Sequence, residues 1–216
     1  LALRKYITQV NGRNVANTRV PNIDTSKLET GTTADYKHRK DPVIVEDKDE
    51  VTYTLAIYNE GNKAGYASEI IDQLPTGLIS SPNNSTTVVS KDQNGNAKNT
   101  YALTYNTTTN QITLKIENGT QAKDLNAYTT GKLDYETIEI KCKVAQGADT
   151  KNDKILTNVA WINKAHDSEN NKDATDRDSK TEIPNVESNQ EVNKNNTEDY
   201  QGDKDNKTDL ADKDNY

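Results

Sequence analysis

The chain has 216 residues, of which 31% are hydrophobic and 28% charged, with one cysteine and neither methionine nor phenylalanine. It contains no apolar run of about 18 residues and no apolar segment typical of a signal peptide, so we expect neither membrane insertion nor an export signal in this fragment. A single cysteine cannot form an internal disulfide, and an extracellular domain of this composition would need another source of stability.

Acidic residues are concentrated at the end of the chain. Residues 165–216 contain 15 Asp and Glu against 7 Lys and Arg, whereas the preceding residues contain 19 acids against 20 bases. Residues 165–216 also have few aliphatic side chains, so they cannot bury enough apolar surface to offset the entropy lost on ordering. We predict one folded unit over residues 1–164 and a disordered acidic linker or tail over residues 165–216. Neither part has a basic patch, which argues against nucleic-acid binding.

The pattern within residues 1–164 is that of short β-strands separated by turns rich in Asn, Gly and Pro. Residues 51–58 alternate between apolar and smaller or polar side chains, which predicts a strand with one buried and one wet face. A short helix or turn is expected at residues 124–128, and no longer amphipathic helix is found. Many strands at this spacing predict an all-β sandwich. The candidate strands cover residues 1–10, 42–45, 51–58, 67–72, 86–90, 101–105, 111–117, 136–144 and 155–163.

Three of these strands carry one polar residue in phase with their apolar residues. Lys5 alternates with Leu3 and Ile7, Asp72 follows Ile70 by two positions, and Asn158 precedes Ala160 by two. Because every second side chain of a strand points the same way, all three polar groups should face the core. Isolated buried charges cost several kcal/mol, so we expect the three side chains to meet and to neutralise their charge, most economically by reacting.

Residues 41–78, DPVIVEDKDEVTYTLAIYNEGNKAGYASEIIDQLPTGL, resemble the conserved-repeat surface domains of Gram-positive bacteria. The shared features are the strand VTYT, an Asn-x-Gly turn, and an aspartate followed by Leu-Pro and Gly-Leu. The opening LALRKYITQVNG and the closing LTNVAWI are similar to the first and last strands of those repeats. The resemblance implies an immunoglobulin-like β-sandwich that is exported and often tandemly repeated.

The resemblance also implies a chemical role for the three polar residues. Related collagen-adhesin and pilin modules form a spontaneous isopeptide bond between a lysine on the first strand and an asparagine on the last, assisted by an acid between them. Lys5, Asn158 and Asp72 occupy the matching positions. The acid varies among such modules, so Glu139, and less so Glu69, are alternative assistants. A plain Lys5–Asp72 ion pair, with Asn158 at a strand end, is the unreacted alternative.

Other constellations give weaker predictions. Cys142 lies in phase with Ile140 and Val144, which is typical of a buried small hydrophobe. The two histidines lie in polar surroundings and assemble no zinc site or nucleophilic triad, so we do not expect an enzyme with turnover. Clustered carboxylates after residue 165 could hold Ca²⁺ at a domain junction, although the glycine and closing glutamate of an EF-hand loop are missing, and no other cofactor is expected. These calcium candidates are Asp167, Glu169, Asp173, Asp176 and Asp178.

The sequence thus predicts a structural stalk or spacer module of a bacterial cell-surface or cell-wall adhesin, with neighbouring repeats of the same polypeptide as its partners. The alternative is a ligand-binding adhesin module that recognises host matrix or glycan through its loops.

Overall fold

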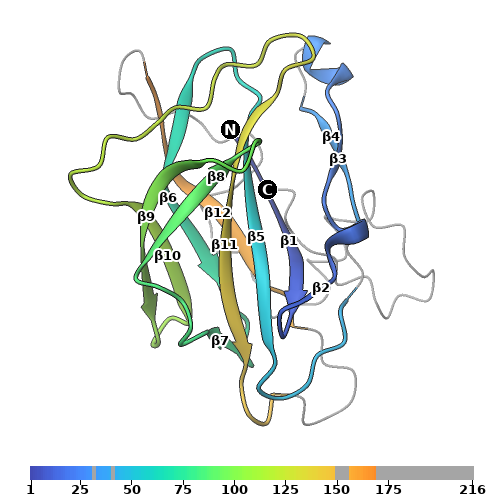
Figure 1. The fold of residues 1–216 in the computed structure, drawn as a ribbon, viewed down its shortest axis with the longest axis vertical. Helices are drawn as coiled ribbons and strands as arrows, with labels where there is room; N and C mark the ends of the chain where they lie inside the picture. The colour runs from blue at the N-terminus through green and yellow to red at the C-terminus, as the bar shows by residue number, and fades with distance from the viewer. Residues whose placement is uncertain (31–32, 40–41, 149–155, 169–216) are drawn as a thin grey trace.

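The computed structural model describes residues 1–30, 33–39, 42–148 and 156–168, and these residues form an all-β, antiparallel sandwich (Figure 1). The described part has two short 3₁₀ helices, η1 (Ala16–Thr18) and η2 (Ser26–Thr30), and no helix in it is long and apolar enough to cross a membrane. The strands are β1 (Ala2–Val10), β2 (Arg13–Asn14), β3 (Asn22–Asp24), β4 (Asp35–Lys37), β5 (Glu50–Asn59), β6 (Gly65–Gln73), β7 (Leu78–Ser80), β8 (Thr87–Asp92), β9 (Ala97–Asn106), β10 (Gln111–Ile116), β11 (Asp134–Val144) and β12 (Val159–Asp167).

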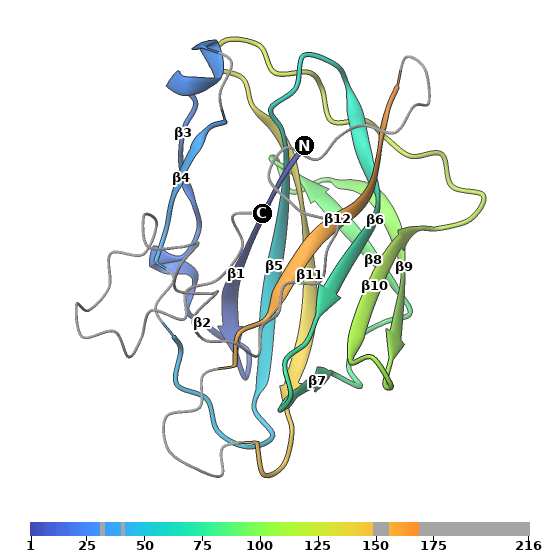
Figure 2. The same ribbon diagram turned by 180° about the vertical axis from the view of Figure 1, so that it is seen from behind.

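The main sheet is antiparallel and folds back on itself. Its strand order is β12-β6-β10-β9-β8-β11-β5-β1-β2, and β7 pairs with the end of β11. Figures 1 and 2 show β12, β6, β10 and β9 in one layer and β11, β5 and β1 in the other. β8 joins the layers because it pairs with both β9 and β11. The first and last strands, β1 and β12, come into contact across the sandwich.

The core lies between the two layers. Ile70, Ile112 and Ile162 enter it from one layer, and Leu55 and Ile138 from the other, all buried. In β6, β10 and β11 the inward residues alternate with less buried ones, as is usual where one face of a sheet is covered. β6 and β12 approach each other so closely that a Cβ on Gly65 would clash with the carbonyl oxygen of His166, which explains the glycine at the start of β6.

A second apolar cluster covers the outer face of β1 and β5. The covering segment consists of β2, η1, β3, η2 and β4 (residues 13–30 and 33–37), with β3 and β4 paired in a sheet of their own. Tyr36 from this segment packs against Tyr58 with ring centroids 4.9 Å apart, and the Arg4 guanidinium lies 4.0 Å from the centre of the Tyr36 ring. Thr52, Thr54 and Ala56 are therefore buried. The prediction of a wet face for this strand was wrong, because a distant hairpin covers it.

The predicted all-β class is confirmed, with differences in detail. Residues 42–45 form no strand, and residues 124–128 contain only the isolated bridge between Leu125 and Gly65. The covering segment and β7 were not predicted, because their strands are too short to show alternation. The last strand extends to Asp167, three residues beyond the predicted end of the folded unit. The predicted tail lies outside the described residues from 169 onward.

Candidate functional site

Cross-strand pairing places Lys5 inside the sandwich. On the three neighbouring strands, Lys5 of β1 pairs with Leu55 of β5, which pairs with Ile138 of β11. Paired residues of antiparallel strands project to the same side, and Leu55 and Ile138 are core residues, so the lysine side chain enters the core with them. Only 1% of Lys5 is exposed. A register shift of one residue would turn it to the outer face instead.

Asp72 meets Lys5 from the opposite layer. Near the end of β6, its carboxylate Oδ1 accepts a hydrogen bond from Lys5 Nζ at 2.7 Å, and 1% of Asp72 is exposed. The ammonium also lies 4.7 Å from the centre of the Tyr53 ring, a distance at which the ring face attracts a cation. The two groups that the sequence placed in the core are thus an ion pair linking the layers, 67 residues apart in the chain.

Asn158 lies directly before β12, the strand that pairs with β6. Ala160 pairs with Asp72 across β6 and β12, and Asn158 precedes Ala160 by two positions, which places it along the same side of the strand. Asn158 is 5% exposed, and neither its Nδ2 nor its Oδ1 has a hydrogen-bond partner among the described residues. A buried primary amide without partners costs on the order of 1–3 kcal/mol per group.

The surroundings of the three side chains are apolar. Cys142 on β11 is fully buried, as predicted, and its burial, with a smaller contribution from the Asp72 charge, raises the pKa of its thiol well above the ordinary value. Leu3 on β1 and Ile140 on β11 are buried in the same core cluster. Charge is therefore poorly solvated here, so neither partner of the Lys5–Asp72 pair could be buried without the other at little cost.

The alternative acids lie elsewhere. Glu139 is exposed and belongs to the face of β11 opposite the core residues Ile138 and Ile140. Glu69 lies at the surface, where it accepts a hydrogen bond from Asn163 and lies 3.7 Å from Lys164 Nζ. Asp72 is the acid that the fold brings to Lys5, because it alone of these carboxylates shares the phase of the core residues.

The calcium candidates are not brought together in the described part. Asp167 Oδ2 lies 3.7 Å from Lys63 Nζ, and the remaining candidates, Glu169, Asp173, Asp176 and Asp178, lie outside the described residues. Among the residues that are described, no group of three or more His, Cys, Asp or Glu side chains is arranged to hold a metal ion.

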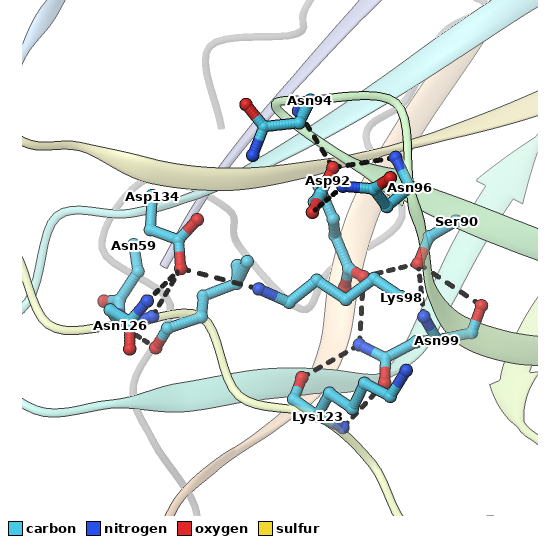
Figure 3. A network of polar contacts seen from close by, with 12 residues as sticks. Asn59, Ser90, Asp92, Asn94, Asn96, Lys98, Asn99, Lys123, Asn126 and Asp134 are labelled. Atoms are coloured by element: carbon cyan, nitrogen blue, oxygen red, sulfur yellow. Dashed lines mark hydrogen bonds and ion pairs between the residues drawn. The ribbon is translucent and has the colours of Figure 1, made fainter.

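A second buried carboxylate was missed by the sequence reasoning. Glu136 on β11 is fully buried, and its carboxylate accepts hydrogen bonds from Ser90 (2.6 Å), Asn99 (2.9 Å) and Tyr101 (2.8 Å). Burial and the neighbouring carboxylate raise the pKa of Tyr101, so its hydroxyl remains a donor. Figure 3 shows Asn99 between Ser90 and the backbone of Lys123, to which it donates at 3.0 Å. The network joins three strands to the long β10–β11 connection.

Glu60 fastens the covering segment in a similar way. Its carboxylate accepts hydrogen bonds from the Thr33 hydroxyl, the Ala34 amide and the Tyr36 hydroxyl at 2.8 to 3.0 Å. Glu136 is in phase with the core residues Ile138 and Ile140, so phase alone could have marked it as buried, but not which donors it meets. Glu60 shares the phase of Thr52 and Thr54, the face predicted to be wet, so its burial depends on the covering segment.

No family model and no curated protein matches this chain. Among solved structures, the chain is similar to the collagen-binding domain from a Staphylococcus aureus adhesin, with 16% identity over 67% of this chain and 93% of that chain and a TM-score of 0.35. It is also similar to the group B streptococcus pilus 2b backbone protein, with 19% identity over 64% and 57% and a TM-score of 0.34. A third similar structure is the collagen-binding domain of Erysipelothrix rhusiopathiae surface protein RspB, with 15% identity over 59% and 38% and a TM-score of 0.33. The chain therefore spans 57% and 38% of the second and third structures.

Proposed function

We propose that this chain is a structural module of a bacterial cell-surface adhesin or pilus-like protein, stabilised by an isopeptide bond between Lys5 and Asn158 that Asp72 helps to form. The module acts outside the cell, has no enzymatic turnover, and has neighbouring modules of the same polypeptide as its partners. The observation that carries the proposal is the buried Lys5–Asp72 pair, at 2.7 Å, together with a buried Asn158 amide that has no hydrogen-bond partner among the described residues.

The proposed chemistry requires only the side chains of Lys5, Asp72 and Asn158. In an apolar site a proton passes from Lys5 Nζ to Asp72, which leaves a neutral amine beside a neutral acid. Protonated Asp72 then donates a hydrogen bond to the Asn158 carbonyl oxygen and polarises its carbon. Lys5 Nζ attacks that carbon, the new C–N bond forms, and one proton of the attacking nitrogen passes to Nδ2. The bond from carbon to Nδ2 then breaks and one ammonia leaves, and Asp72 ends with the proton that it took from the ammonium.

The same fold supplies the driving force. Holding the amine, acid and amide together turns a slow bimolecular reaction into an intramolecular one. The product replaces a buried ammonium and a primary amide by one secondary amide, so fewer polar groups need partners in the core. The bond would link the first strand to the last and would be insensitive to reducing conditions, as suits a chain with one buried cysteine.

Mass spectrometry of the denatured chain tests this function. The proposal expects the intact mass to fall short of the calculated mass by one ammonia, and expects this deficit to be absent from Lys5→Ala, Asp72→Ala and Asn158→Ala. Tandem mass spectrometry of a tryptic digest should then contain a branched peptide joining the segments around Lys5 and Asn158. A full mass in the unaltered chain would refute the bond and leave an ordinary sandwich.

The second candidate function is that of a ligand-binding adhesin module for host matrix or glycan. It is favoured by a groove at one end of the sandwich, described below, and it differs from the first in requiring a ligand. Variants of the groove should abolish binding without affecting the Lys5–Asn158 bond, which separates the two functions experimentally.

A further inference from the structure

A groove opens at one end of the sandwich, where β8 and β9 no longer pair. β8 pairs with β9 only as far as Ala102, and one further hydrogen bond joins Leu103 N to Thr86 O at 2.7 Å. Beyond it, no described strand pairs with this edge of β9, which continues to Asn106, and β7 lies across the gap on the other layer. The groove between them has a volume of about 660 Å³, within the range of about 300–1,000 Å³ typical of ligand sites.

The groove combines an apolar floor with cationic sides. Ile79, Leu103 and Val144 line it, and Ile79 is 39% exposed, one of few large apolar side chains that the described residues leave in solvent. The charged residues of the lining are Lys48 and Lys143, and no ion pair is found for either within the described ranges. The lining contains no carboxylate, so the groove is complementary to a partner that is partly apolar and acidic.

The carboxylates near Lys48 lie outside the lining of the groove, and several are bonded to other groups. Glu50 lies 3.2 Å from Lys141 Nζ and accepts a hydrogen bond from the Ser81 hydroxyl at 2.6 Å. Asp47 accepts a hydrogen bond from the Gly147 amide at 2.6 Å. Within the lining itself, the charged side chains are the two lysines.

One wall of the groove is held rigidly. The Asn84 side chain forms both hydrogen bonds that a neighbouring strand would form with Lys141. Its Nδ2 donates to Lys141 O at 2.7 Å, and its Oδ1 accepts from Lys141 N at 3.0 Å. Ser81 N also donates to Lys141 O at 2.9 Å. A wall fixed in advance lowers the ordering cost of binding.

The groove is also remote from the described ends of the sandwich. Figures 1 and 2 show that β1 begins and β12 ends in the upper half of the molecule, whereas β7 lies at the lower end beside the ends of β9 and β11. The start of β1 and the end of β12 therefore lie at the opposite half of the molecule from β7, which borders the groove.

We propose that this groove binds an extended peptide segment of another protein that carries acidic side chains. The unpaired edge of β9 would add the peptide as a strand, because its backbone N–H and C=O groups can pair with an extended chain. Alternate side chains of the peptide would contact Leu103 and Ile79, and its carboxylates would pair with Lys48 and Lys143. This site is separate from the Lys5–Asn158 centre and does not depend on that bond.

The test uses the full chain and a phage-displayed library of random linear peptides. Peptides are selected on the unaltered chain and counter-selected on the Lys48→Glu/Lys143→Glu variant, and their affinities are measured by fluorescence anisotropy. The proposal expects enrichment of acidic peptides with β-branched or other apolar residues, an affinity at least tenfold weaker for the double variant, and weaker binding as salt increases. Amide NMR signals of residues 104–106 should shift on binding.

The matched control is Lys91→Glu/Lys132→Glu, which makes the same total change of charge at two exposed lysines that do not line the groove. It should bind the selected peptides as the unaltered chain does, and equal thermal unfolding of all variants checks that the double variant is folded. Peptides that bind all variants equally, or a selection without acidic enrichment, would overturn the proposal. Displacement of the peptides by an acidic polysaccharide that itself shifts the residue 104–106 signals more strongly would assign the groove to a glycan instead.

Discussion

Replacing Lys5 and Asp72 together measures the free energy contributed by the proposed covalent bond. Lys5→Met alone removes the bond but also leaves the buried Asp72 carboxyl group without the lysine nitrogen beside it, which costs about 1–3 kcal/mol by itself. The double variant Lys5→Met/Asp72→Leu replaces both side chains by apolar ones of similar size, so no buried carboxyl group is left without a partner. Its loss of stability therefore reports chiefly on the bond.

The magnitude follows from the length of the closed loop. A bond between residues 5 and 158 closes a loop of 153 positions (158 minus 5). In the chain-entropy model for cross-links, a loop of this length contributes about 5 kcal/mol to the free energy of unfolding. Since 1 kcal/mol shifts the melting temperature of a domain of this size by about 2–4 °C, the double variant should melt about 10–20 °C lower.

Differential scanning calorimetry of the unaltered chain, the double variant and Lys5→Met gives these values, with intact masses measured on the same samples. Lys5→Met should melt at a lower temperature than the double variant, because its buried Asp72 carboxyl group is left without a partner. A double variant that melts with the unaltered chain, while the latter carries its ammonia deficit, would refute the entropy argument. The same melting temperature without a deficit would refute the bond itself.

Further predictions concern the other buried groups. Glu136→Leu should lower the free energy of unfolding by on the order of 3–5 kcal/mol in urea titrations, because it leaves buried hydroxyl and amide donors without an acceptor, and Glu136→Gln should cost less. Glu60→Ala should speed amide hydrogen exchange at Ala34 far more than in the core strands, whereas uniform acceleration would contradict a local fastening role. The hydrogen bond from Ser81 lowers the pKa of Glu50 below its ordinary value of 4.5. The stabilising contribution of Glu50 is therefore present above pH 4.5 and is lost as the pH falls through the lower pKa of the folded state. In Glu50→Gln, the melting temperature should fall less steeply on the acid side of its pH profile. Cys142 should resist thiol reagents at neutral pH until the chain is denatured, and rapid native labelling would show that the core opens there.

The longer strands were predictable because each carries enough alternating residues to show its period. β5 and β11 were predicted to within two residues at each end, and the phase of Lys5 and Asp72 correctly indicated burial. The segments that were missed, β3, β4 and β7, have three residues each, too few for alternation to stand out. Residues 42–45 were predicted as a strand because they are apolar and β-branched, but no partner strand lies beside them.

The sequence by itself determined the all-β class, the phase of each long strand, and therefore which polar residues enter the core, since these follow from the two-residue period of an extended chain. Only the tertiary structure decided that Asp72, rather than Glu139, meets Lys5, because this depends on which strands face one another across the sandwich. It also decided that the outer face of β5 is buried and that β9 keeps an unpaired edge, because both depend on where segments distant in sequence come to lie.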